Sequence, residues 1–192
     1  EPLFAAMAEY DLPIWMHPAR GAEVSDYRSE ERGRYEMWWC FGWPYETSAC
    51  MTRLIYSGIF DKLPDIKIIT HHFGGMIPFF AEKIGIGFQQ IFGQDKDHNP
   101  LAAQAGLKKQ PKDYFKMFYA DTATNGSAAA AACGLEFFGP DHSLFATDAP
   151  FDPEGGSLLI RETINAVDSL DIDAGTRAKI YSGNLERLLK LG

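Results

Sequence analysis

Three apolar, strand-like segments of this sequence each run directly into a side chain that can bind a metal ion or carry a proton. These side chains are His17, the pair His71 and His72, and Asp148. Catalytic groups of parallel α/β barrels stand at the carboxyl ends of the strands, so the pattern predicts one shared site at that end. Imidazoles with a carboxylate are also the protein ligands of catalytic zinc-type sites, which keep one position open for water. A metal-dependent active site is therefore the first expectation.

The chain is long enough for one domain with a sizeable core, and we expect a single domain spanning 1–192. Its formal net charge of −8 argues against a nucleic-acid partner. The three cysteines form no C-x-x-C motif, which indicates reduced thiols rather than a disulfide framework. No apolar stretch approaches the ~20 residues of a membrane span. We therefore expect a cytoplasmic protein with no membrane partner.

Strand-like and helix-like segments alternate along the chain. Strands are expected at 12–17, 66–71, 117–120 and 143–147, the third with Asp121 at its end. Helices are expected at 2–10, 47–56, 76–92, 127–133, 156–168, 173–181 and 184–190. An aromatic insertion is expected at 18–44 and a polar connection at 93–113. Strands joined through helices run parallel with right-handed crossovers. The expected fold class is therefore α/β of the TIM-barrel type, with four parallel βα units.

Four βα units are half of an eight-unit barrel, whose usual length is ~250 residues. An open half-barrel leaves two unpaired sheet edges, which promote aggregation when exposed. A partner, another copy or a missing N-terminal half must therefore cover them. The sequence starts at Glu1 with a segment that reads as a helix already under way. We therefore expect the chain to be the C-terminal part of a longer protein.

Several short motifs occur in a defined order along nearly the whole chain. They are His17-Pro18, Gly42-Trp43-Pro44-x-Glu46-Thr47, Ser57-Gly58-Ile59-Phe60-Asp61-x-Leu63-Pro64-Asp65, His72-x-Gly74-Gly75-x-x-Pro78, Ala146-Thr147-Asp148-x-Pro150-Phe151 and Gly183-Asn184-x-x-Arg187-Leu188-Leu189. This series resembles the C-terminal half of the amidohydrolase-2 family of metal-dependent TIM barrels. Within that family it is similar to aminocarboxymuconate-semialdehyde decarboxylase and the related aromatic-acid decarboxylases. The resemblance implies an enzyme that decarboxylates an aromatic or unsaturated carboxylic acid with a divalent metal, zinc or manganese.

The resemblance also implies residue roles. His17 and Asp148 match metal ligands, and His72 matches a general acid or base beside the metal. His71 matches no role and, as the neighbour of His72 on a strand, is expected to point to the other side. The family's remaining ligands form an H-x-H or E-x-H pair on the first strand, and this sequence has no such pair after an apolar strand. We therefore expect this chain alone to bind the metal weakly or not at all.

Two cations are candidates for binding the carboxylate of a small-molecule substrate. Lys83 stands where the decarboxylases have an arginine that reaches a neighbouring subunit's site, which implies a homo-oligomer; a solvated lysine is the alternative. Arg20 is the second candidate. The aromatic residues between 35 and 43 either wall a ring-shaped substrate or pack a dimer interface, and Asp121 receives no role from the resemblance.

Two other functions remain open beside the decarboxylase. A hydrolase of a lactone or amide in the same family would use the same strand-end groups. A non-catalytic fragment would keep the half-barrel but lack a complete metal site. Release of CO₂, measured against ring opening on a small panel of acids, distinguishes the two enzymatic alternatives.

Overall fold

Four short strands form one parallel sheet in the computed structural model, which describes residues 2–94 and 106–191, with side chains throughout except at 88–94. The strands are β1 (Ile14–Met16), β2 (Ile68–Thr70), β3 (Tyr119–Asp121) and β4 (Ser143–Leu144). They lie in the order β1-β2-β3-β4, and each neighbouring pair is parallel. The prediction of a parallel sheet is therefore confirmed.

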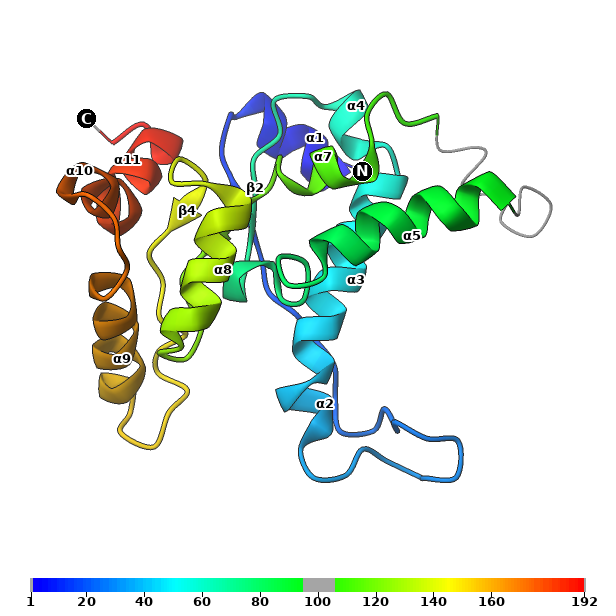
Figure 1. Cartoon of the computed structure of the whole chain (residues 1–192), viewed down its shortest axis with the longest axis horizontal. Helices are drawn as coiled ribbons and strands as arrows, with labels where there is room; N and C mark the ends of the chain where they lie inside the picture. The colour runs from blue at the N-terminus through cyan, green and yellow to red at the C-terminus, as the bar shows by residue number, and fades with distance from the viewer. Residues whose placement is uncertain (1, 95–105, 192) are drawn as a thin grey trace.

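Helices occupy every connection between neighbouring strands, which is why the strands can run parallel (Figure 1). The described helices before β3 are α1 (Pro2–Glu9), α2 (Met37–Cys40), α3 (Gly42–Tyr56), α4 (Ile59–Lys62), the 3₁₀ turn η1 (His72–Gly74), α5 (Ala81–Gln94) and α7 (Pro111–Phe115). Those after β3 are α8 (Ala128–Phe138), α9 (Ser157–Asp168), α10 (Ala174–Ala178), the π-helical turn η2 (Lys179–Gly183) and α11 (Asn184–Leu189).

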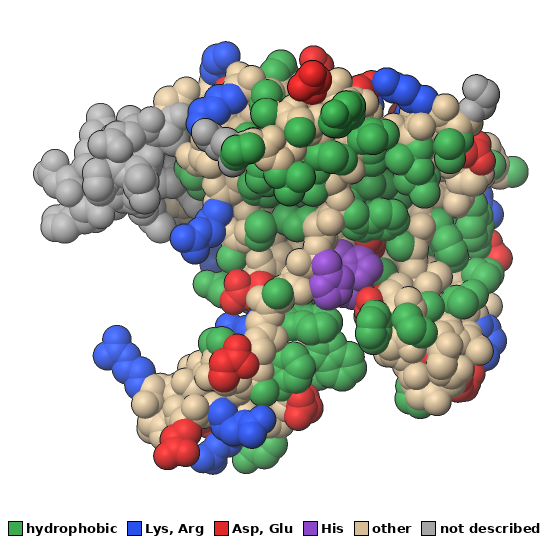
Figure 2. Space-filling model, turned by 180° about the vertical axis from the view of Figure 1, so that it is seen from behind, with side chains coloured by type: hydrophobic (Ala, Val, Ile, Leu, Met, Phe, Trp, Pro, Cys, Tyr) green, Lys and Arg blue, Asp and Glu red, His purple; other side chains and the backbone are tan. Residues whose placement is uncertain are grey.

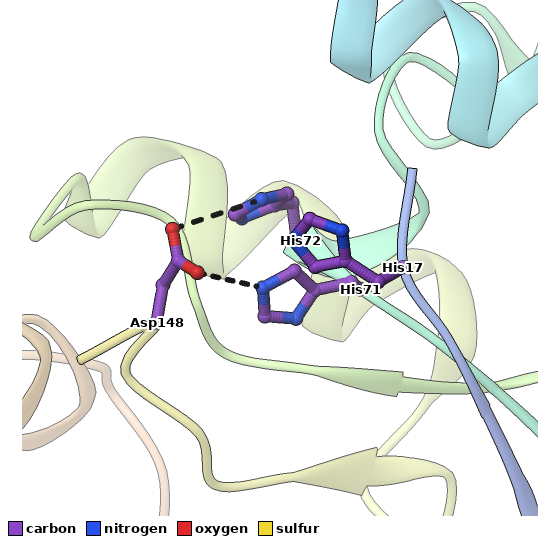
Figure 3. A group of neighbouring side chains, drawn as sticks. All are labelled: His17, His71, His72 and Asp148. Atoms are coloured by element: carbon purple, nitrogen blue, oxygen red, sulfur yellow. Dashed lines mark hydrogen bonds and ion pairs between the residues drawn. The ribbon is translucent and has the colours of Figure 1, made fainter. Parts of the chain in front are cut away.

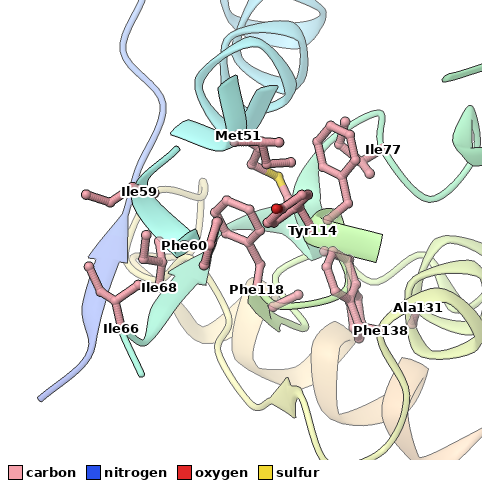
Figure 4. Close-up of a cluster of buried hydrophobic side chains, with 14 residues drawn as sticks. Met51, Ile59, Phe60, Ile66, Ile68, Ile77, Tyr114, Phe118, Ala131 and Phe138 are labelled. Atoms are coloured by element: carbon pink, nitrogen blue, oxygen red, sulfur yellow. The ribbon is translucent and has the colours of Figure 1, made fainter. Parts of the chain in front are cut away.

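The main hydrophobic core lies between one face of the sheet and the helices α3, α4, α7 and α8 (Figure 4). Ile68 and Ala120 supply the sheet side of this core, and both are completely buried. Successive strand residues point to opposite faces, so the other face carries Trp15, Ile69 and Tyr119. Ile69 packs there against Leu144 of β4 and Leu188 of α11, whereas Trp15 keeps 47% of its surface exposed.

The strands are shorter than the sequence predicted, most clearly at the fourth. The segment 143–147 was expected to be a strand, but β4 ends at Leu144. The backbone N–H of Phe145 donates to the carbonyl of Ile180, 2.9 Å away, instead of to a neighbouring strand. The chain therefore leaves the sheet early and approaches Asp148 as an irregular segment.

Other boundaries also differ. The helix expected at 47–56 begins at Gly42, and the one expected at 127–133 continues to Phe138. The segment 173–181 is divided between α10 and the π-helical turn η2. Of the polar connection expected at 93–113, the part 95–105 lies outside the described residues.

Within the described chain, β1 and β4 each pair with a single neighbour, so the sheet is open on both sides. This arrangement is a partial barrel with two free edges, as the pattern of four βα units predicted. No helix in the described ranges has both the length and the apolar character needed to cross a membrane.

Candidate metal centre

The side chains of His17, His71, His72 and Asp148 converge at the carboxyl end of the sheet (Figure 3). One potential ligand atom from each lies within 4.8 Å of those of the other three. His17 follows β1, the two neighbouring histidines follow β2, and Asp148 follows β4. The sequence-based expectation that His17, His72 and Asp148 share one site is confirmed by this geometry.

Two of the imidazoles are oriented by backbone carbonyl groups. Nδ1 of His17 lies 2.6 Å from the carbonyl oxygen of Pro18, and Nδ1 of His72 lies 2.5 Å from that of Ala123. Because a carbonyl oxygen only accepts hydrogen bonds, we assign the proton of each neutral ring to Nδ1. The Nε2 atom of each ring then carries the lone pair that a metal ion requires.

His71 belongs to the same cluster, so the expectation that it points to the other side of the strand is wrong. Its Nε2 lies 3.2 Å from Oδ1 of Asp148 and its Nδ1 lies 2.5 Å from Oδ2 of Asp121. The alternation of side chains fails here because β2 already ends at Thr70 and His72 has a φ of 53°. This left-handed turn brings the second ring back beside the first, with ring centroids 3.8 Å apart.

Asp121, at the end of β3, is fully buried beneath the histidines. Besides His71, it accepts hydrogen bonds from the indole Nε1 of Trp15 at 2.8 Å and from the backbone N–H of His72 at 3.0 Å. Sequence reasoning gave this residue no role. The available signal was its position, since it ends a strand at the same edge of the sheet as the other site residues.

The charges of the cluster shift its ionisation. Burial disfavours the charged form of His71, but hydrogen bonds and charge from Asp121 and Asp148 outweigh this and raise the pKa of His71 to about 9. Burial and the neighbouring charge of His71 lower the pKa of His72. Burial also opposes ionisation of Asp148, yet its hydrogen bond to His71 and the nearby imidazoles keep its pKa below the ordinary value. The metal-free cluster therefore contains an ion-pair network centred on the His71 imidazolium, with Asp121 on one side and Asp148 on the other.

Strained backbone surrounds these groups. His72, Phe73 and Asp148 have positive φ values of 53°, 45° and 64°. Such left-handed conformations cost of order 1–3 kcal/mol each and concentrate at functional sites. Gly75, which ends the same turn, has a φ of 61° and lies so close to α3 that a Cβ atom there would stand 2.4 Å from the carbonyl oxygen of Pro44. The histidine turn is therefore packed directly against the start of α3.

An aromatic-walled cavity of about 360 Å³ adjoins the cluster. Its walls include Trp39, Trp43, His72 and Asp148. Trp43 also meets the His17 ring edge-on, with centroids 5.2 Å apart. The space-filling view shows the histidines in a recess bordered by hydrophobic side chains (Figure 2). Trp39 and Trp43 of the aromatic insertion thus face the candidate site, whereas Tyr35 and Phe41 are exposed. Both predicted uses of the insertion, a substrate wall and a dimer interface, stay predictions.

The two candidate carboxylate-binding cations lie in different surroundings. Arg20 lines a second hollow together with His17 and Trp43. Its guanidinium lies 3.1 Å from Asp26 and 3.6 Å from Glu46, so two carboxylates already partner it. Lys83 is exposed on α5, with Nζ 5.8 Å from the centre of the Phe80 ring, and it lines neither hollow.

The donor set fits a divalent metal. Three imidazoles and one carboxylate are the nitrogen and oxygen donors that zinc and other first-row metals accept. Three protein ligands are enough for a catalytic site that keeps a position for substrate or water. Among the described residues, this cluster therefore offers the minimum set and one further group for proton transfer. The expectation that this chain alone binds metal weakly counted only His17 and Asp148 as ligands. His71 adds a third candidate ligand, and the expected weak binding stays a prediction.

Comparison with known proteins identifies relatives over the whole chain. Residues 1–191 match the family described as Amidohydrolase. The chain is 30% identical to gamma-resorcylate decarboxylase of Polaromonas sp., covering 99% of this chain and 57% of that protein. It is 23% identical to 2-amino-3-carboxymuconate-6-semialdehyde decarboxylase of Dictyostelium discoideum, covering 99% of this chain and 48% of the relative.

Solved structures give the same result. The 5-carboxyvanillate decarboxylase of Sphingomonas paucimobilis superimposes with a TM-score of 0.78 and 25% identity, over 100% of this chain and 53% of that chain. A dihydroxybenzoic acid decarboxylase of Polaromonas sp., solved with bound manganese and the inhibitor 2-nitroresorcinol, gives a TM-score of 0.74 and 27% identity, over 99% and 53%. The chain thus spans about half the length of the relatives it matches.

Proposed function

Because the chain belongs to the amidohydrolase family, we propose that it forms the metal-binding C-terminal part of a decarboxylase for aromatic or unsaturated carboxylic acids. One observation carries the proposal: a cluster of three imidazoles and a carboxylate borders an aromatic-walled cavity at the carboxyl end of a parallel sheet. The relatives named as decarboxylases of resorcylate, carboxyvanillate and 6-methylsalicylate support this chemistry over other reactions of the family.

We assign His17 and Asp148 as metal ligands and add His71 as the third. His71 takes this place because its Nε2 already lies beside the Asp148 carboxylate, while its Nδ1 is held on the opposite side of the ring. A divalent ion in this position supplies Lewis-acid stabilisation of negative charge on the substrate. Zinc and manganese both suit the donor set, and two of the related decarboxylase structures were solved with bound manganese.

His72 is left for proton transfer. Its Nδ1–H donates to Ala123, and its lowered pKa keeps the ring neutral near pH 7. In a decarboxylation the bond to the carboxylate carbon breaks, its electron pair remains on the substrate carbon, and that carbon takes a proton. His72 lines the cavity, so its Nε2 can accept a proton there and return it to this carbon.

The aromatic wall and Arg20 are assigned to the substrate. Trp39 and Trp43 offer flat apolar surfaces to a ring. Arg20 faces the neighbouring hollow, and its Nε is buried without a hydrogen-bond partner among the described residues. Lys83 lines neither hollow, so we retain it as a substrate-binding residue only for a homo-oligomer in which it reaches a neighbouring subunit's site.

The remaining assignments follow from composition and size. We propose that 1–192 forms a single domain of a cytoplasmic enzyme that acts on small carboxylates and binds neither nucleic acid nor membranes. The net charge of −8 supports the exclusion of nucleic acid, because a surface for that partner is normally basic.

The test is a measurement of CO₂ release. The protein is dialysed free of metal, loaded with Mn²⁺ or Zn²⁺, and supplied with 2,6-dihydroxybenzoate, 5-carboxyvanillate and a set of lactones. We expect metal-dependent CO₂ release from an aromatic acid, and we expect His72→Asn to abolish this activity while leaving metal binding intact. Ring opening of a lactone without CO₂ release would favour the hydrolase alternative. Bound metal without either reaction would favour the non-catalytic alternative.

A further inference from the structure

We propose that Asp121 is the positioning residue of this site: it fixes the orientation and tautomer of His71 and holds the turn that presents His72. The role deepens the proposed function, since the groups that it positions are those assigned to metal binding and proton transfer. It rests on hydrogen bonds that reach Asp121 from Trp15 in β1 and from the segments that follow β2 and β3.

Asp121 has a complete set of donors. Oδ2 accepts from Nδ1 of His71 at 2.5 Å and from Nε1 of Trp15 at 2.8 Å. Oδ1 accepts from the backbone N–H groups of His72 at 3.0 Å and Ala123 at 3.2 Å. An ionised carboxylate has about four acceptor sites, so the four donors occupy all of them. The side chain is also fully buried. Asp121 therefore has no acceptor position left for a metal ion or a substrate, and it acts on the site through the residues that it hydrogen-bonds.

The effect on His71 is specific. The other two imidazoles of the cluster donate Nδ1–H to backbone carbonyl groups, whereas His71 donates to a carboxylate. A charged acceptor makes a stronger hydrogen bond, and a carboxylate behind a metal-binding histidine sets the ring orientation and increases its basicity. With Nδ1–H directed at Asp121, Nε2 is the atom presented to Asp148.

The effect on His72 passes through the backbone. Asp121 accepts the N–H of His72, a residue in the left-handed conformation, and the N–H of Ala123. The carbonyl of Ala123 in turn accepts Nδ1–H of His72. One carboxylate therefore holds both the strained residue and the group that orients its ring.

Asp121→Asn is the direct test, because asparagine keeps the shape but places an NH₂ donor among N–H donors. In the metal-free 192-residue chain with ¹⁵N-labelled histidine, we expect the slowly exchanging Nδ1–H signal of His71 to disappear from the NMR spectrum. We expect the affinity for Mn²⁺ or Zn²⁺ to fall about 10–100-fold. The same change at the exposed Asp171, Asp171→Asn, is the control and should alter neither quantity.

A second set of variants separates positioning from a general loss of structure. In a His71→Gln background, Asp121→Asn should weaken metal binding far less than it does in the wild type, whereas a merely structural role would weaken both backgrounds equally. Trp15→Phe removes one donor from Oδ2 at a half-exposed position and should shift the His71 signal and reduce metal affinity about two- to tenfold. This variant carries the test if Asp121→Asn does not fold.

The proposal is overturned if Asp121→Asn keeps the His71 Nδ1–H signal and the wild-type metal affinity, or if the losses are equal in the two backgrounds. The NMR spectra and the metal titrations do not require the chain to catalyse a reaction. A chain that fails to decarboxylate any acid would therefore refute the proposed function while leaving the role of Asp121 to be decided by the spectra and the metal titration.

Discussion

Gly75→Ala is expected to destabilise the protein strongly, because two separate penalties meet at this position. Gly75 has φ 61° and ψ −115°, a conformation that residues with a side chain rarely adopt, and forcing alanine into it costs about 1–3 kcal/mol. The added Cβ would also stand 2.4 Å from the carbonyl oxygen of Pro44. Because backbone atoms must move to relieve this contact, a further cost of about 1–3 kcal/mol is expected, giving a total loss of about 2–6 kcal/mol.

Gly58→Ala is the matched control for the contact. Gly58 also has a positive φ, 71°, but no heavy atom lies within 4 Å of the place its Cβ would take. Its expected cost is the left-handed strain alone, about 1–2 kcal/mol. Urea unfolding followed by tryptophan fluorescence measures both variants, and equal slopes in the two transitions validate the comparison.

The position of Gly75 adds a second expected result. It ends the turn that carries His72 and packs against the first turn of α3, where Trp43 lines the cavity. Relief of the contact should therefore move the histidine turn away from the aromatic wall, so Gly75→Ala should also weaken metal binding while Gly58→Ala should not. If the two variants unfold within about 1 kcal/mol of each other and bind metal equally, the packing described for this turn is refuted.

Three other predictions concern the cluster. The pKa of His71 is raised to about 9 from 6.5. Protonated His71 should therefore contribute fully to the free energy of unfolding of the metal-free protein below about pH 6.5, and this contribution should be lost as the pH rises through 9. Urea unfolding should show this loss of stability in the wild type and not in His71→Gln. Metal binding near pH 8 should release about one proton from His71, which calorimetry in buffers of different ionisation enthalpy detects, and an unchanged heat across buffers would contradict it. His17→Ala should weaken metal binding at least 100-fold. The control is His142→Ala, which removes an imidazole that is hydrogen-bonded to the Phe118 carbonyl and should leave metal binding unchanged. Equal losses in the two variants would show that the metal binds elsewhere.

The parallel sheet and the convergence of its strand ends could be predicted from sequence, because both depend on a repeating pattern. Apolar segments joined by helices force parallel strands, and parallel strands deliver their final residues to one edge. His17 and Asp148 were located in this way even though β4 is only two residues long.

The parts that could not be predicted depend on single backbone angles and on long-range hydrogen bonds. Successive side chains of a strand point to opposite faces, which predicted that His71 and His72 point apart. The left-handed φ of His72 instead turns its side chain back beside that of His71. The role of Asp121 is equally hidden, because two of its partners, Trp15 and His71, lie 106 and 50 positions away in the sequence. Neither feature leaves a local signature in residue spacing.

The wide separation of the site residues along the chain has a consequence for the order in which the protein folds. His71 and Asp148 are 77 positions apart and the indole of Trp15 reaches Asp121 across 106. Contacts of this range form late, since the closure of each long loop costs entropy before the contact stabilises anything. We therefore expect the cluster to be complete only after the segment following β4 has docked, so metal uptake should mark the end of folding. An ion that binds only this finished arrangement draws the folding equilibrium toward the native chain in proportion to its concentration.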